Sequence, residues 1–195
     1  MKVLAINGSP RPTGNTAHML KTVLEVCAKS GHETELYQAG GQEVYGCMGC
    51  SYCMTNKGQC MQGGWVNELY VKMKEADAIV IGSPTYFSDL TPETKALIDR
   101  TGVMSRKDGN AFSRKIGAAV TAVRRAGGIH TLDSINHMFQ ICDMIIPGSS
   151  YWNMSLSREL GDYAKDAEGI RTMERLGENI AWLLGMIEKD TGEIV

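Results

Sequence analysis

Short apolar runs alternate with longer amphipathic stretches along most of the chain. The apolar runs predict five strands, at residues 2–7, 33–38, 78–82, 116–121 and 144–146, the last of which either ends there or resumes at 151–154. Apolar residues spaced by three and four predict five helices, at residues 15–29, 65–74, 92–100, 129–141 and 163–187. This alternation is typical of an α/β fold in which helices cover both faces of a parallel sheet.

The pattern also orders the strands by environment. Residues 33–38 alternate polar and apolar, as in an edge strand, whereas residues 78–82 and 116–121 are apolar throughout, as in buried central strands. At 195 residues, with 43% hydrophobic and 22% charged residues, the chain fits a single domain, 1–195. The polar stretch 105–114 is short enough to be a surface loop rather than a linker.

Charge and hydropathy argue against several classes of partner. The net charge is -2, and the 20 basic and 22 acidic residues are spread along the chain, so we expect neither a nucleic-acid-binding nor a membrane-binding surface. No stretch approaches the roughly 18 apolar residues of a membrane span, and the N-terminal apolar run is too short for a signal peptide. We therefore expect a cytoplasmic protein.

A candidate phosphate-binding loop, Gly8-Ser9-Pro10-Arg11-Pro12-Thr13-Gly14-Asn15-Thr16, lies between the first predicted strand and the first predicted helix. Such a turn directs backbone N–H groups and the positive end of a helix dipole at an anion. Its spacing matches neither the dinucleotide fingerprint nor the nucleoside-triphosphate loop. A monoester phosphate fits better, although a purely structural turn would use similar residues. The candidate ligand-binding residues are Ser9, Arg11, Thr13, Gly14, Asn15 and Thr16.

Four of the six cysteines, Cys47, Cys50, Cys53 and Cys60, form a C-x2-C-x2-C-x6-C motif. Four soft ligands select zinc or an iron-sulfur cluster. Zinc sites usually use two separated pairs, so three evenly spaced cysteines favour a cluster, with zinc and free redox-active thiols as alternatives. Cys27 and Cys142 each lie in a helical pattern among apolar residues and are expected to be buried hydrophobes.

The first loop, together with Gly82-Ser83-Pro84-Thr85-Tyr86-Phe87 after the third strand, resembles the NADPH-dependent FMN reductase group of flavodoxin-like proteins. The resemblance extends from residue 1 to about residue 148. It implies that the first loop binds the FMN phosphate and that Pro84, Thr85, Tyr86 and Phe87 follow the edge of the flavin ring. It also places Gly127 and Gly128, after the fourth strand, beside the flavin, although a plain turn explains this pair equally well.

The cysteine motif, in a loop at about residues 45–62, is similar to that of the iron-sulfur flavoproteins, in which it binds a [4Fe-4S] cluster. This chain departs from many relatives in having Met61-Gln62-Gly63-Gly64 where they carry an acidic pair. The resemblance further implies a homodimer or homotetramer, and either NAD(P)H or a ferredoxin-like protein as electron donor. The last helix, which is more apolar than one-sided packing needs, fits docking on the sheet or a subunit interface.

Together these observations predict a flavodoxin-like, doubly wound, three-layer α/β/α fold with strand order 2-1-3-4-5. In that order the loops after strands one, three and four meet at the carboxyl edge of the sheet. The expected function is an FMN-dependent oxidoreductase that passes electrons between FMN and a [4Fe-4S] cluster, with no catalytic acid or base assigned. The alternatives are an NAD(P)H-dependent FMN or quinone reductase without a cluster, and a zinc-stabilised or thiol-sensing binding module.

Overall fold

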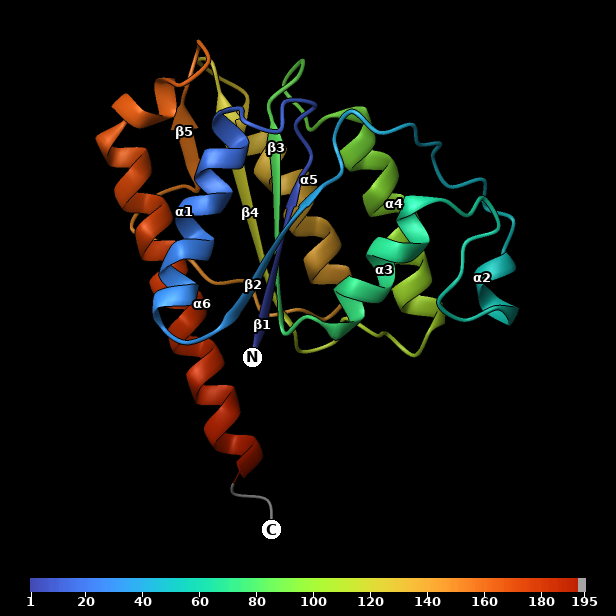
Figure 1. The fold of residues 1–195 in the computed structure, drawn as a ribbon. Helices are drawn as coiled ribbons and strands as arrows, with labels where there is room; N and C mark the ends of the chain where they lie inside the picture. The colour runs from blue at the N-terminus through green and yellow to red at the C-terminus, as the bar shows by residue number, and fades with distance from the viewer. Residues whose placement is uncertain (193–195) are drawn as a thin grey trace.

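The computed structural model describes residues 1–192, with side chains placed up to residue 189. The strands are β1 (Lys2–Asn7), β2 (Glu33–Gln38), β3 (Ala78–Pro84), β4 (Ile116–Val123) and β5 (Met154–Leu156). They form one parallel sheet in the order β2-β1-β3-β4-β5 (Figure 1). The predicted fold class and strand order are thus confirmed, and β2 lies at an edge of the sheet as expected.

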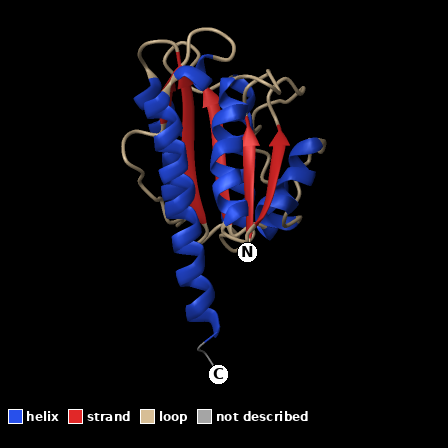
Figure 2. Cartoon of the chain, turned by 60° about the vertical axis from the view of Figure 1, so that its left-hand side comes forward, coloured by secondary structure: helices blue, strands red, loops and turns tan. Residues whose placement is uncertain are grey.

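Helices cover both faces of this sheet (Figure 2). They are α1 (Asn15–Lys29), α2 (Tyr52–Thr55), α3 (Trp65–Glu75), α4 (Pro92–Lys107), α5 (Gly128–Ile141) and α6 (Ala167–Gly192), with a 3-10 turn, η1 (Asp162–Lys165). One face packs against α1 and α6, and the other against α3, α4 and α5. None of the helices described between residues 1 and 192 is long and apolar enough to cross a membrane.

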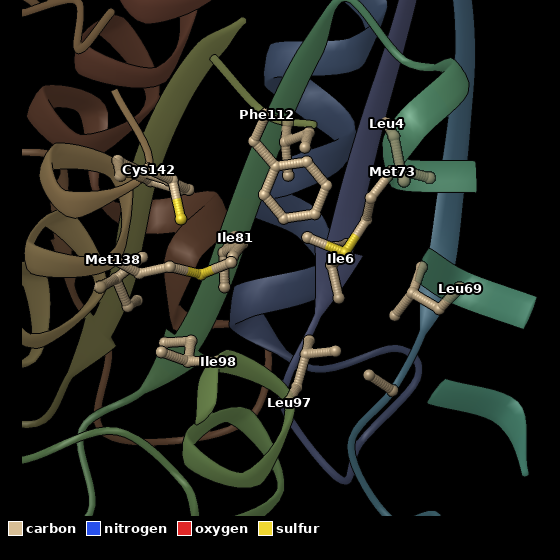
Figure 3. Close-up of a cluster of buried hydrophobic side chains, with 14 of the residues drawn as sticks. Leu4, Ile6, Leu69, Met73, Ile81, Leu97, Ile98, Phe112, Met138 and Cys142 are labelled. Atoms are coloured by element: carbon tan, nitrogen blue, oxygen red, sulfur yellow. The ribbon is translucent and has the colours of Figure 1, made fainter. Parts of the chain in front are cut away.

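The strands divide their side chains between two cores. Because successive residues of a strand point to opposite faces, Val3 and Ala5 of β1 pack with α1 and α6, while Leu4 and Ile6 pack with α3 and α4. Figure 3 shows Leu4 and Ile6 among side chains from the surrounding helices. Both β3 and β4 contribute to each core, which explains their continuous apolar sequences.

The fifth strand differs from the prediction. Residues 144–146 form only an isolated bridge, between Ile145 and Ile116, and the true strand β5 pairs Met154–Leu156 with the end of β4. Pro147 follows the bridge and has no N–H to donate to a ladder, so the chain leaves the sheet there and returns at residue 154. The predicted resumption at 151–154 therefore overlaps the strand only at its last residue.

Two helix boundaries also differ. Helix α4 continues to Lys107, so the predicted loop 105–114 begins inside a helix, and this loop is anchored by Phe112, which is fully buried. The last helix begins at Ala167 rather than at residue 163, because residues 162–165 form the 3-10 turn. The short helix α2 lies within the cysteine segment, for which no secondary structure was predicted. Cys27 and Cys142 are fully buried, as expected.

Candidate functional site

A cavity of about 180 Å³ opens at the carboxyl edge of the sheet, where the chain leaves β1, β3, β4 and β5. It brings together four segments that are far apart in the sequence: the first loop, the end of β3 with the residues after it, the end of β4 with the residues after it, and the residues after β5. Its lining consists of Ser9, Arg11, Gly14, Asn15, Thr16, Pro84, Thr85, Tyr86, Ala122, Arg124, Ser157 and Arg158. Most of the predicted ligand-binding residues thus share one cavity.

The side-chain amides of Asn7 and Gln38, at the ends of β1 and β2, hold the first loop in place; neither residue was predicted from the sequence. The fully buried Asn7 side chain accepts a hydrogen bond from the Ser9 backbone N–H (3.1 Å) and donates one to Gln38 Oε1 (2.7 Å). Gln38 in turn donates to the Ser9 carbonyl (2.7 Å). Gly8 is needed at the start of the loop, because a Cβ there would lie 1.9 Å from Thr94 Oγ1 and 2.9 Å from the Gly82 carbonyl oxygen.

The start of α1 is open to a ligand. Gly14, the residue before the helix, has extended backbone angles (φ -79°, ψ 176°), and no side chain caps the helix N-terminus. The first-turn N–H groups, with the positive end of the helix dipole, therefore face the cavity as an anion site. Ser9 Oγ accepts a hydrogen bond from the Arg11 N–H (3.2 Å), so the Ser9 hydroxyl hydrogen can be donated to an anion. Ser9 and Thr16 are both buried.

Asn15 lines the cavity but also bonds to a distant segment, whereas Thr13 lies outside the cavity lining. The Asn15 side chain donates to the Glu159 carbonyl (2.8 Å) and accepts hydrogen bonds from the N–H groups of Gly161 (3.0 Å) and Tyr163 (3.3 Å). It therefore holds the segment after β5 beside the first loop while it also lines the cavity. Thr13 is exposed and is not among the cavity-lining residues.

The loop after β3 makes a tight turn. The backbones of Tyr86 and Asp89 exchange hydrogen bonds (2.7 and 3.0 Å) around Phe87 (φ 48°) and Ser88 (φ 66°). Two successive left-handed residues define a type I′ turn, which a phenylalanine adopts only under strain. The Phe87 side chain is fully exposed to solvent, whereas Tyr86 is half-exposed and lines the cavity. Tyr86 is thus the aromatic side chain that borders the cavity.

Thr85 is also committed to internal contacts. Its hydroxyl lies 3.1 Å from Thr121 Oγ1 and 3.0 Å from Thr131 Oγ1, and its N–H donates to the Ala122 carbonyl (3.0 Å). Because a hydroxyl has one hydrogen, these threonines compete with any ligand for it. The side chain of Thr85 therefore fixes the loop to β4 and α5.

Gly127 and Gly128 both allow close packing at the start of α5. Gly127 has φ +87°, and a Cβ on it would lie 2.8 Å from Ser88 Oγ. A Cβ on Gly128 would meet the Met154 side chain at 3.2 Å. Gly127 thus permits close approach to the loop after β3, and Gly128 permits close packing on β4 and β5. Neither residue is among those that line the cavity.

Three residues that line the cavity were not predicted as binding residues from the sequence: Arg124, Ser157 and Arg158. Ser157 donates its N–H to the Val123 carbonyl (2.8 Å), which brings the chain after β5 to the end of β4. Both residues immediately follow the carboxyl end of β5, so a correct placement of that strand would have revealed them. Among the described residues, Arg11, Arg124 and Arg158 are the charged groups that line the cavity, which suits an anionic ligand.

The four cysteines of the motif line a second cavity, of about 100 Å³, between the segment around α2 and helix α4. Arg100, Val103, Met104 and Lys107 of α4 form its other wall. Burial raises the pKa of the Cys53 thiol, and the neighbouring thiols act in the same direction. Among the described residues the two cavities have no lining residue in common. The cysteine segment follows the carboxyl end of β2, but within one chain its cavity is distinct from the cavity at the end of β1, β3 and β4.

The four cysteines of this second cavity are the residue type that binds an iron-sulfur cluster. Within the described residues, no three Cys, His, Asp or Glu side chains converge closely enough to hold a single metal ion. All four cysteines nevertheless line one cavity, and the buried Arg100, which lines it with them, has a side-chain nitrogen, Nε, without a hydrogen-bond partner among the described residues. An unpaired buried cationic donor next to four thiols suits an anionic thiolate-bound group.

A doubly wound sheet with a phosphate-type loop and an aromatic loop at its carboxyl edge is the arrangement of flavodoxin-like flavin proteins. The profile of the NADPH-dependent FMN reductase family matches residues 1–159. The chain therefore belongs to this family, and within it to the iron-sulfur flavoproteins. It is a flavin-dependent oxidoreductase that uses FMN.

Individual relatives support this assignment. An iron-sulfur flavoprotein of Methanocaldococcus jannaschii is 35% identical over 97% of this chain and 100% of its own length. Another, from Methanosarcina thermophila, is 29% identical over 97% of this chain and 98% of its own.

Solved structures agree on the fold. RosB, determined with bound 8-demethyl-8-formylriboflavin-5'-phosphate, matches 97% of this chain and 81% of its own with a TM-score of 0.73 at 18% identity. A flavodoxin from the domain Archaea matches 95% of this chain and 99% of its own with a TM-score of 0.65 at 16% identity.

Proposed function

We propose that this oxidoreductase passes electrons between FMN, bound at the carboxyl edge of the sheet, and a [4Fe-4S] cluster bound by Cys47, Cys50, Cys53 and Cys60. The observation that carries the cluster half of this proposal is that all four cysteines line one cavity. The relatives named iron-sulfur flavoproteins support the same pairing. When bound, FMN supplies two-electron or one-electron chemistry and the cluster supplies one-electron chemistry.

The residues of the first cavity would bind and orient the flavin. The helix N-terminus, with the hydroxyls of Ser9 and Thr16, donates hydrogen bonds to the phosphate, and Arg11 adds a charged donor. Pro84 and Tyr86 then border the ring. Asn15 and Thr85 also line this cavity, and their side chains hold the adjoining segments in place. No side chain is assigned as a catalytic acid or base.

The partner proteins and the assembly follow from the family resemblance. We propose that the donor is either NAD(P)H or a ferredoxin-like protein, and that the protein works as a homodimer or homotetramer. Because the two cavities are separate within one chain, electrons would pass either along the chain or across an interface between subunits. Free thiols in this number suit the reducing cytoplasm, where we expect the protein to act.

Anaerobic purification tests the cluster directly. The experiment measures the absorption spectrum together with iron, acid-labile sulfide and zinc per chain. We expect FMN bands near a 1:1 ratio, broad iron-sulfur absorption, and about four irons and four sulfides per chain. A C50S/C53S variant should retain the FMN and lose the iron.

Other outcomes separate the alternatives. FMN without iron, together with rapid NAD(P)H oxidation, would identify a plain FMN or quinone reductase. Zinc, or no metal, without turnover would identify a zinc-stabilised or thiol-sensing module. Iron that remained bound to the C50S/C53S variant would contradict the assigned ligands.

A further inference from the structure

Arg100 stands out in the cavity that the cysteines line. It lies on α4, the residue is 4% exposed, and it lines this cavity together with all four cysteines. One guanidinium nitrogen, Nη2, donates to the Gly63 carbonyl at 2.7 Å, close after Cys60 in the chain. The Nε–H has no hydrogen-bond partner in the described part of the chain.

A buried cation with a free donor is costly unless an anion faces it. No carboxylate is among the described residues that line this cavity, and its other charged side chain is the exposed Lys107. If Arg100 only anchored the loop, its hydrogen bond to the Gly63 carbonyl would be sufficient. That role does not explain why the guanidinium group is buried while its Nε–H lacks a partner among the described residues. A negatively charged sulfur group in the cavity satisfies both the charge and the donor.

We infer that Arg100 is a positioning residue for the cluster, to which it supplies the Nε–H donor and a nearby positive charge, and that it thereby raises the reduction potential of the cluster. The inference rests on the proposed function. Reduction adds one electron, and hence one negative charge, to a cluster that four thiolates already make anionic. A buried cation stabilises the reduced form more than the oxidised form, and hydrogen bonds to sulfur act in the same direction.

The first test is a redox titration of the anaerobic holoprotein, with dithionite as the low-potential reductant and with EPR detection of the reduced cluster. The variant R100Q removes the charge, whereas R100K keeps it. We expect R100Q to lower the reduced-to-oxidised ratio at a fixed potential at least tenfold, which corresponds to a shift of about 59 mV to more negative potential. R100K should lie closer to the wild type.

Arg106 provides a matched control on the same helix. It also donates to a backbone carbonyl, that of Ile141, at 2.7 Å, but its side chain is exposed. Arg106 lies outside the cavity of the four cysteines, although it borders a more open groove that Cys47 also lines. R106Q therefore removes the same charge and the same kind of hydrogen bond from a solvent-exposed position, and we expect its midpoint potential to shift much less than that of R100Q. Equal potentials for R100Q and the wild type would overturn the inference, as would equal shifts in R100Q and R106Q.

A second measurement needs no variant that could fail to fold. In wild-type protein labelled with 15N-arginine, electron spin echo spectra of the reduced cluster should show a 15N coupling from the guanidinium group. A labelled protein whose cluster is intact but shows no such coupling would overturn the role of Arg100 and leave the proposed function standing. A wild-type protein without iron and sulfide would overturn both.

Discussion

Replacing both Ser9 and Thr16 with alanine removes two hydroxyl donors from the proposed phosphate site while leaving the backbone N–H groups in place. A hydrogen bond to a charged group contributes about 1.5–3 kcal/mol, so two independent bonds would contribute about 3–6 kcal/mol. Because both would serve one phosphate, they are not independent, and we take the lower end of this range. At about 1.4 kcal/mol per tenfold, FMN should bind at least about 100-fold more weakly.

The affinity can be measured by titrating apoprotein into FMN and following the quenching of flavin fluorescence. Thr13→Ala is the matched control, since Thr13 belongs to the same loop but is exposed and outside the cavity lining, and its affinity should change by less than about twofold. Thermal unfolding of the apoproteins shows whether each variant folds. A folded double variant that binds FMN as tightly as the wild type would refute the phosphate assignment, and a large loss in the Thr13 variant would refute the geometry of the loop.

Three further predictions concern the framework of the site. Gly8→Ala should lower the free energy of unfolding by about 1–3 kcal/mol, because its Cβ meets Thr94 Oγ1, and Thr94→Ala should restore part of that loss; denaturant titrations that show no such coupling would contradict the packing. Asn15→Ala removes three hydrogen bonds and should cost about 2 kcal/mol while raising protease cleavage after β5; unchanged cleavage would contradict the anchoring role. Lys74, through its hydrogen bond, holds the pKa of Asp108 below its usual value, so this carboxylate stabilises the fold above its unfolded pKa of about 3.9, and the stabilisation is lost as the pH falls through its lower folded pKa. Asp108→Asn should therefore lower the melting temperature at pH 7 and have progressively less effect below pH 4; a deficit that is the same at both pH values would contradict the ion pair.

The sequence alone determined the repeating framework of the protein. Buried parallel strands have continuous apolar sequences and surface helices have periodic ones, so four of the five strands and helix α1 were correctly placed by local pattern. The first loop and the cysteine motif were also visible in the sequence, because each is a contiguous run whose chemistry depends on spacing. The fifth strand was misplaced, since three residues beside a proline-interrupted loop carry too little pattern.

Only the tertiary structure decided which side chains of those motifs face a cavity. Asn15, Thr13 and Phe87 belong to the right loops, but their directions depend on contacts with residues distant in sequence, or on a turn whose backbone angles a local pattern does not specify. Arg124, Ser157 and Arg158 join the site because the ends of β4 and β5 meet in space. Arg100 joins the cysteines because α4 packs against the segment around α2, a contact between positions about 40–50 residues apart that no local spacing encodes.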